Sequence, residues 1–372
     1  MKYNIDPELR FVSKIKMPNY PKLLPMINAV CRGFLCRTDK KAVVRRYRMQ
    51  GYLGAPLLVH VIEPKQTTKQ QKSLPCLVLF HGGGFMLRAS GIHYKIAKEY
   101  AVRMQCKVIH ADYRLAPKYP FPIPAEDCFA AYQWTLSHAK QLGIDKENVF
   151  LGGDSAGGDL AAATVFMARD RNCPLPKGVL LVYPVLDRRM QTMSMRTFTD
   201  TPVWDAKLNR TMWQCYIGKE TPAPVEYASP AEATDVSCFP PTYLEVAEFD
   251  CLHDEGAEFG KRLEKSGVAV ELHEIKGGCH GYETAINSLV MKTCLDMRIA
   301  WMKKLVNKIK KTEKVNVGFL PRVQKVQSIR STSDTDKSYS GFKRNETVSF
   351  NKARIQWKTA GYGWNDKTWR KS

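Results

Sequence analysis

Gly153-Asp154-Ser155-Ala156-Gly157 places a serine between small residues directly after a short apolar run. The apolar run at 148–151 predicts a strand, and the Ala-rich pattern at 155–169 predicts a helix. A serine on such a sharp strand-to-helix turn exposes its hydroxyl, and small neighbours relieve the crowding of the turn. The helix N-terminus also favours developing negative charge. We therefore expect Ser155 to be a nucleophile rather than an ordinary helix cap.

A glycine-rich stretch, His81-Gly82-Gly83-Gly84-Phe85, follows a predicted strand at 75–80. Glycines let the backbone approach a ligand closely, although a glycine run by itself is equally typical of a flexible turn. Its place one strand unit ahead of the serine motif favours a binding role. Together with the N–H of Ala156, its N–H groups would hold the oxyanion of a tetrahedral intermediate, at roughly 3 to 4 kcal/mol per donor.

A serine nucleophile needs a base, and the base needs an orienting carboxylate. Asp250 follows a predicted strand at 241–246, and His280 follows another at 268–275. Both lie beyond carboxyl ends of strands, at the edge of the sheet where Ser155 emerges. The order Ser, Asp, His is the one expected for α/β-hydrolases. We therefore predict a catalytic triad of Ser155, Asp250 and His280.

Other acids and histidines compete for these two roles. Asp254 and Glu255 lie where the next helix begins, and carboxylates there are more often caps or dipole partners, so Asp250 is preferred. His280 is preferred as the base because it follows two glycines in a loop after the last strand. The histidines that we interpret as structural are His110, His253 and His273.

Short apolar runs alternate with helical patterns from about 43 to 305, which predicts a mostly parallel sheet covered by helices. An antiparallel hairpin is expected at the start, since two alternating runs are joined by a turn that contains glycines. The hairpin strands are expected at 43–52 and 56–63, and the other strands at 75–80, 107–111, 148–151, 178–183, 241–246 and 268–275. The helices are expected at 125–142, 155–169 and 287–309.

At these motifs the chain resembles the hormone-sensitive lipase family of α/β-hydrolase esterases, which includes bacterial acetyl esterases and arylacetamide deacetylase-like enzymes. The resemblance covers about 74–282. Besides the motifs around Ser155 and His81, it rests on Asp112-Tyr113-Arg114-Leu115-Ala116-Pro117, Asp250-Cys251-Leu252-His253-Asp254-Glu255 and His280-Gly281.

The resemblance implies the α/β-hydrolase fold with a helical cap, made from the N-terminal region and from an insertion after the sixth strand. It also implies Gly83, Gly84 and Ala156 as the donors of the oxyanion hole. Two positions depart from the family pattern: Lys118 stands where Glu is usual, and Tyr282 stands where Phe is usual. We expect Tyr282 to alter the pocket.

Two segments stand outside the alternation, 1–42 and about 187–225, and we expect them to form the cap of a catalytic domain that spans 43–309. The pattern changes after this domain. Residues 310–372 hold 15 Lys and Arg against 5 Asp and Glu, which is nearly half of the formal net charge of +21. We expect this basic tail to be disordered and to attract anionic surfaces or polyanions, although its aromatic residues leave docking onto the body open.

The overall composition, 44% hydrophobic and 25% charged residues, is typical of soluble globular proteins. The first ten residues lack the pattern of a secretory signal, and the apolar segment at 23–35 is too short for a membrane span and favours an amphipathic helix. Eleven scattered cysteines without zinc-site spacing favour a reducing compartment, which predicts a cytoplasmic protein.

Together these features predict a serine carboxylester hydrolase that cleaves small or short-acyl esters through an acyl-enzyme, without a metal or organic cofactor. Amide hydrolysis or deacetylation stays open, since the same triad can expel an amine. A non-catalytic small-molecule receptor on this fold, like the plant gibberellin receptors, is a further alternative that the complete triad disfavours. A nucleic-acid binder is disfavoured because no recognised binding motif accompanies the basic charge.

Overall fold

The computed structural model describes residues 2–17, 23–32, 36–65, 73–218 and 222–307. Within these residues eight strands form one sheet in the order β1-β2-β4-β3-β5-β6-β7-β8. β2 pairs antiparallel with both β1 and β4, and all other neighbours are parallel. This confirms the predicted opening hairpin and the mostly parallel sheet. The strands are β1 Ala42–Gln50, β2 Pro56–Pro64, β3 Leu74–Phe80, β4 Lys107–Ala111, β5 Ile144–Asp154, β6 Val179–Val182, β7 Thr242–Phe249 and β8 Val270–Cys279.

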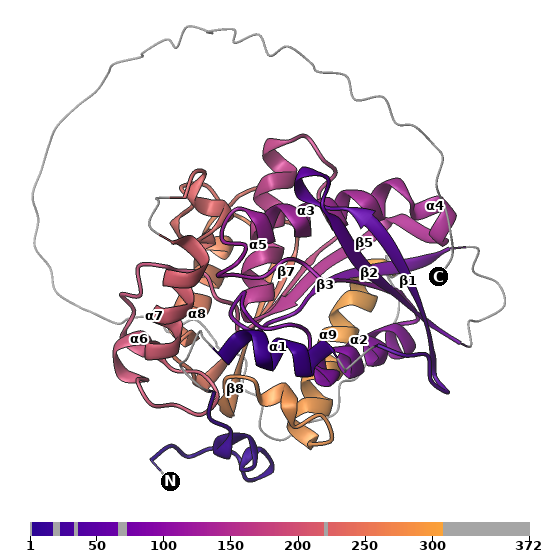
Figure 1. Cartoon of the computed structure of the whole chain (residues 1–372). Coiled ribbons are helices and arrows are strands. Elements are labelled where there is room, and N and C mark those ends of the chain that lie inside the picture. Colours follow the sequence, from indigo (N-terminus) through magenta and orange to yellow (C-terminus); the bar gives the residue numbers. More distant parts are fainter. Residues whose placement is uncertain (1, 18–22, 33–35, 66–72, 219–221, 308–372) are drawn as a thin grey trace, which may run out of the picture. The chain divides into compact units, whose positions relative to one another are not determined.

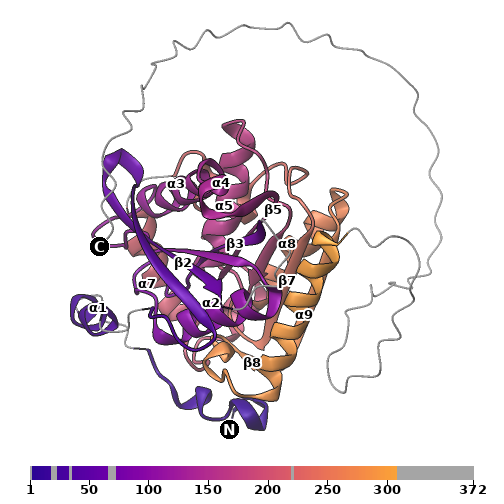
Figure 2. The same cartoon turned by 90° about the vertical axis from the view of Figure 1, so that its right-hand side faces the viewer.

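Helices cover both faces of the sheet, as Figures 1 and 2 show. The buried side chains of α3, α5 and α8 join one hydrophobic cluster, and those of α2 and α9 join another. The helices are α1 Leu24–Arg32, α2 Gly91–Met104, α3 Ile123–Ser137, α4 Ala139–Leu142, α5 Ala156–Asp170, α6 Met193–Thr197, α7 Ala206–Ile217, α8 His253–Lys265 and α9 Leu289–Val306. The arrangement is the α/β-hydrolase fold that was expected.

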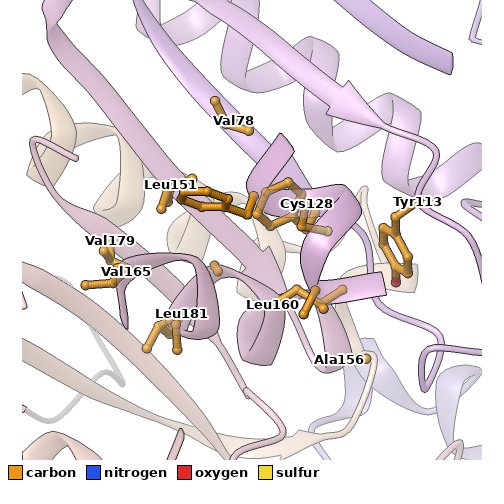
Figure 3. Close-up of a cluster of buried hydrophobic side chains, with 14 of the residues drawn as sticks. Val78, Tyr113, Cys128, Leu151, Ala156, Leu160, Val165, Val179 and Leu181 are labelled. Atoms are coloured by element: carbon orange, nitrogen blue, oxygen red, sulfur yellow. The ribbon is translucent and has the colours of Figure 1, made fainter. Parts of the chain in front are cut away.

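The two clusters follow from the period of two in a strand, which sends successive side chains to opposite faces. In β3, Val78 belongs to the cluster under α3 and α5, whereas Leu77 and Leu79 belong to the cluster under α2 and α9. Figure 3 shows the first cluster, in which Leu151 of β5 and Leu160 of α5 lie with Val78. The sheet is therefore buried on both faces, so its central strands read as continuous apolar runs.

Several predicted boundaries were wrong by a few residues. The helix expected at 125–142 is two helices, α3 and α4, which meet at His138. The last helix begins at Leu289 rather than 287, because the hydroxyl of Ser288 accepts the N–H of Met291 and caps it. The strand expected at 268–275 continues to Cys279, so it ends directly before His280.

The N-terminal segment contains the amphipathic helix that was expected between 23 and 35. α1 buries Leu24 and exposes Met26 and Val30. Asn28 anchors this helix, because its side chain donates to the carbonyl of Met86 at 2.9 Å and accepts the N–H of Arg88 at 2.9 Å. No described helix is long and apolar enough to cross a membrane. The tail at 310–372 lies outside the described residues.

Candidate active site

Ser155 lies on a strained turn between β5 and α5. Its backbone has φ 54° and ψ −122°, a conformation that L-residues rarely adopt. The turn is held in place because the N–H of Ser155 donates to Val182 at 2.9 Å and its carbonyl accepts the N–H of Val185 at 3.0 Å. A Cβ atom on Gly153 would overlap the carbonyl oxygen of Gly157, and one on Gly157 would overlap the carbonyl of Phe80. The small residues of the motif are therefore a steric requirement of the turn.

The loops after β7 and β8 bring Asp250 and His280 to this serine. Nδ1 of His280 lies 2.7 Å from Oδ2 of Asp250, and Nε2 lies 3.0 Å from Oγ of Ser155. An ionised carboxylate only accepts, so Nδ1 carries the proton and Nε2 is free to accept the serine hydroxyl. The other oxygen of Asp250 accepts the N–H of Leu252 at 3.0 Å. All three predicted residues are buried and form one hydrogen-bonded chain.

The competing acids bond elsewhere. Asp254 accepts the N–H of Ser194 at 2.7 Å, and its own N–H donates to the hydroxyl of Ser194 at 3.1 Å, so it fastens α6 to α8. The sequence also suggested that Asp254 caps its own helix, α8, but α8 has no side-chain cap. Glu255 is buried and accepts the N–H of Leu186 at 2.7 Å. Desolvation raises the pKa of Glu255 well above its usual range.

The glycine-rich loop lies beside the nucleophile. Gly83 and Gly84 have φ values of +115° and +61°, and both line a pocket together with Ser155 and His280. A Cβ atom on Gly84 would come within 2.7 Å of the Trp204 ring. The third expected donor, the N–H of Ala156, opens α5 at the same turn. The backbone thus brings all three predicted oxyanion donors to the serine.

The stretch at 112–117 braces this loop from the side. The hydroxyl of Tyr113 donates to the carbonyl of His81 at 2.7 Å, and the N–H of Ala116 donates to the carbonyl of Phe85 at 2.9 Å. Arg114 continues the brace with a two-bonded ion pair to Asp127, at 2.7 and 2.8 Å. The motif therefore supports the site without entering the pocket, among whose lining residues it does not appear.

Sequence reasoning missed two polar residues next to Ser155, namely Asp154 and His93. Asp154 accepts the N–H of Gly82 at 3.0 Å, and Nε2 of His93 lies 3.5 Å from its other oxygen. Burial acts to raise the pKa of Asp154, but His93 and the Gly82 N–H outweigh this and lower it. Because Nδ1 of His93 accepts the N–H of Ser90 at 2.9 Å, Nε2 is the nitrogen that donates to Asp154. Asp154 stood in the quoted motif, but only the fold reveals its partners.

A pocket of about 270 Å³ is lined by Ser155 and His280. Its walls are mostly apolar, and they come from three parts of the chain. The N-terminal segment contributes Met17, Ile27 and Cys31, and the insertion contributes Val203 and Trp204. The catalytic body contributes the remaining lining, including Leu87, Arg88, Ile92, Tyr183 and Glu283.

The expectation that Tyr282 alters the pocket was wrong. Its side chain is completely buried behind the site, where its hydroxyl donates to Glu245 and accepts from Arg298. The chain turns at Gly281, which has φ +68°, so that Tyr282 points into the core while His280 faces the serine. Tyr282 is not among the residues that line the pocket.

No group of three His, Cys, Asp or Glu side chains in the described part of the chain is arranged to hold a metal ion. All eleven cysteines lie in this part, and all of them are free thiols. Cys251 directly follows Asp250 and Cys279 directly precedes His280 in the sequence, and burial raises the pKa of both thiols, to about 12 for Cys279. A thiol with so high a pKa is a poor nucleophile at neutral pH.

Comparison with known proteins places this geometry in a family. A family model described as the alpha/beta hydrolase fold matches residues 77–284. The chain is 35% identical over 220 residues to esterase LipI of Mycobacterium tuberculosis, a match that covers 58% of this chain and 68% of LipI. It is 36% identical over 218 residues to carboxylesterase NlhH of the same species, covering 56% and 67% of the two chains. The structure of a bacterial heroin esterase superposes with a TM-score of 0.74 at 32% identity, covering 82% of this chain and 100% of the other.

Proposed function

The chain belongs to the α/β-hydrolase fold family, among its hormone-sensitive lipase-like members, and from this premise we propose that it is a serine carboxylester hydrolase with Ser155 as nucleophile, His280 as base and Asp250 as orienting acid. The observation that carries the proposal is the position of His280, whose two ring nitrogens lie 2.7 Å from Asp250 and 3.0 Å from Ser155. Esterase and carboxylesterase relatives support ester bonds as the target.

In the proposed reaction, Nε2 of His280 takes the hydroxyl proton while Oγ of Ser155 attacks the ester carbonyl. The N–H groups of Gly83, Gly84 and Ala156 stabilise the oxyanion that forms. The carbonyl re-forms as the C–O bond to the alcohol breaks, and His280 returns the proton to the alcohol. Water then attacks the acyl-serine by the same route and releases the acid.

The pocket limits the substrates that we propose. About 270 Å³ of mostly apolar space suits an ester with a small or short acyl group. We propose that segments 1–42 and 187–225 act as the cap, since Met17, Ile27 and Trp204 from these segments line the pocket. The cap would then set which acyl and alcohol groups enter.

We propose a cytoplasmic location on the basis of the eleven free thiols, because disulfides form and persist mainly in oxidising compartments. We further propose that the basic tail at 310–372 contacts anionic surfaces or polyanions through its 15 Lys and Arg.

The test of the proposed function is Ser155→Ala on the full-length chain. We expect the variant to lose hydrolysis of a short activated ester and to keep its melting temperature, and we expect a serine-directed organophosphate to label only the wild type. Ser266→Ala, at the end of α8, is the matched control and should keep full activity. A panel of matched esters and amides separates the carboxylesterase from the amidase alternative. Wild-type turnover by Ser155→Ala would refute the nucleophile assignment.

A further inference from the structure

Two aromatic rings lie against the imidazole of His280. The Tyr183 ring is 4.8 Å away between centroids, at an interplanar angle of 58°, and the Trp204 ring is 6.0 Å away. Trp204 comes from the insertion, whereas Tyr183 directly follows β6. The carbonyl of Val182, the residue before Tyr183, accepts the N–H of Ser155. Tyr183 therefore touches the proposed base and is bonded through the backbone to the turn of the proposed nucleophile.

Tyr183 has a strained backbone that is held at both ends. Its φ of 33° is positive, which is costly for a bulky L-residue and persists only where the surroundings enforce it. Its N–H donates to the carbonyl of Glu245 at 2.8 Å, and its hydroxyl donates to Oε2 of Glu283 at 2.6 Å. The ring is thus fixed in place by hydrogen bonds as well as by packing.

Glu283 is in turn fixed by a buried cation. The Arg298 side chain on α9 has no exposed surface, and it forms ion pairs with both Glu283 and Glu245. Its contacts with Glu245 measure 2.6 Å from Nη2 and 3.0 Å from Nε. A buried charge is costly unless it is fully paired, so the partners of Arg298 have little freedom to move.

The contact with Tyr183 restricts a tilt of the His280 imidazole that the hydrogen bond to Asp250 does not prevent. The bond from Nδ1 to Asp250 fixes one edge of the imidazole, but the ring can still tilt about that bond. Nε2 must point at Ser155 and, later, at the leaving alcohol, so a tilt misplaces the proton transfer. Tyr183 lies against the ring and opposes this tilt. The network thus reaches His280 through the ring of Tyr183.

We propose that Tyr183 is a positioning residue for His280, and that the Glu283–Arg298 ion pair fixes the Tyr183 ring through its hydroxyl. The proposal rests on the proposed function, because it concerns the same base. It assigns Tyr183 no contact with the reacting atoms.

The chain offers a matched pair of variants. Tyr183→Phe keeps the ring and removes the bond to Glu283. Tyr282→Phe removes a hydroxyl from the same network, but among the described side chains the ring of Tyr282 packs against Tyr183 and not against His280. Tyr183→Phe loses one buried hydrogen bond and Tyr282→Phe loses two, so both should lower the melting temperature. Only the first should disturb the imidazole.

We expect Tyr183→Phe to lower kcat for a short activated ester by about tenfold to a hundredfold, with KM little changed, because misplacing a catalytic group by about 1 Å costs on that order. The pH profile of kcat should change with it. Tyr282→Phe should keep both kcat and the pH profile. Glu283→Gln retains an acceptor for the Tyr183 hydroxyl, so its loss in kcat should be smaller than that of Tyr183→Phe.

Equal kcat for the two tyrosine variants would overturn the proposal, and so would a Glu283→Gln loss larger than that of Tyr183→Phe. The first result would make the network purely structural, and the second would make the charge of Glu283 the active element. Wild type and Ser155→Ala are measured on the same ester. If these two are equally active, the proposed function itself fails; if only Ser155→Ala is inactive and Tyr183→Phe has full kcat, only the positioning role fails.

Discussion

Asp154 accepts the N–H of Gly82 at 3.0 Å, so the residue directly before the nucleophile also fixes the first glycine of the loop beside it. The β5 turn and the β3 loop are 72 residues apart in sequence and share this one partly buried carboxylate. This side chain therefore helps to hold the turn of the proposed nucleophile and the loop of the proposed oxyanion donors in register.

Asp154→Ala should lower both stability and turnover. It leaves the Gly82 N–H without its partner in a buried place, which costs about 1 to 3 kcal/mol in the free energy of unfolding. It also frees the glycine loop, so kcat for a short ester should fall about tenfold or more. Asp154→Asn keeps an acceptor oxygen and should lose less in both respects. Chemical denaturation and steady-state kinetics test this, and an Asp154→Ala variant with wild-type kcat would contradict it.

Gly157→Ala should destabilise the fold by about 1 to 3 kcal/mol, because its Cβ would overlap the backbone carbonyl of Phe80, which cannot rotate away. Gly260→Ala is the matched control. Gly260 lies inside α8, and the nearest atom to its Cβ would be 3.7 Å away. The control should therefore gain about 0.5 to 1 kcal/mol, since alanine is the better helix residue. Equal melting temperatures for the two variants would show that the turn at Ser155 tolerates a side chain at position 157.

Asp250→Asn should mainly lower turnover, whereas Asp254→Asn should mainly lower stability. Asp250 bonds His280, so the first variant should lose turnover on the order of 10⁴-fold, the loss known for an Asn in this role in another triad enzyme. Asp254 accepts the N–H of Ser194, and asparagine keeps an acceptor oxygen, so the second variant should keep turnover and lose only about 0.5 to 1.5 kcal/mol in stability as this hydrogen bond loses its charge. Kinetics and thermal unfolding of both variants separate the two effects. A kinetic loss confined to Asp254→Asn would reverse the assignment of the acid.

Asp159→Asn should stabilise the protein, and more so as the pH rises. Asp159 is completely buried in α5, and neither carboxylate oxygen has a hydrogen-bond partner among the described residues. Burial, and then the charge of Glu255, raises its pKa well above the usual range. Above a pH of about 3.9 the unfolded chain loses this proton while the folded chain keeps it, so folding weakens by about 1.4 kcal/mol per pH unit until the folded pKa is reached.

Asparagine cannot ionise, so the Asp159→Asn variant escapes this loss. Its melting temperature should exceed that of the wild type by more at pH 8 than at pH 5, while ester turnover is retained. Asp296→Asn is the control, because that carboxylate is 66% exposed and paired only at the surface. A difference in melting temperature that does not grow with pH would contradict the burial of an unpaired acid.

Much of the fold and of the site was predictable because the deciding residues lie close together in sequence. Ser155 is identified by its own flanking glycines, and Asp250 and His280 each follow a strand that can be recognised by its apolar run. The contacts of Tyr183 could not be predicted, because Glu283 is 100 residues away and nothing local marks it. The prediction that Tyr282 alters the pocket was wrong for a similar reason, since only the turn at Gly281 decides that its side chain points into the core.

Removal of residues 308–372 should leave short-ester hydrolysis nearly unchanged and weaken binding to anionic surfaces and polyanions. The tail holds nearly half of the net charge, whereas the proposed triad and its pocket lie entirely within the described residues up to 307. Clustered Lys and Arg attract polyanions through interactions that added salt screens. Retention on an anionic resin should therefore fall in the truncated chain, and the salt sensitivity of the retention should fall with it.

The competing hypothesis is that the tail tryptophans dock on the enzyme and contribute to its stability or turnover. A full-length variant with Trp357, Trp364 and Trp369 changed to alanine separates the two hypotheses, because it keeps every tail charge. If charge is what matters, this variant should match the wild type in turnover, melting temperature and salt-dependent retention, and only truncation should reduce the retention. If both changed chains lose turnover or melt several degrees earlier while the retention stays constant, the tail is part of the catalytic body and its charge is incidental.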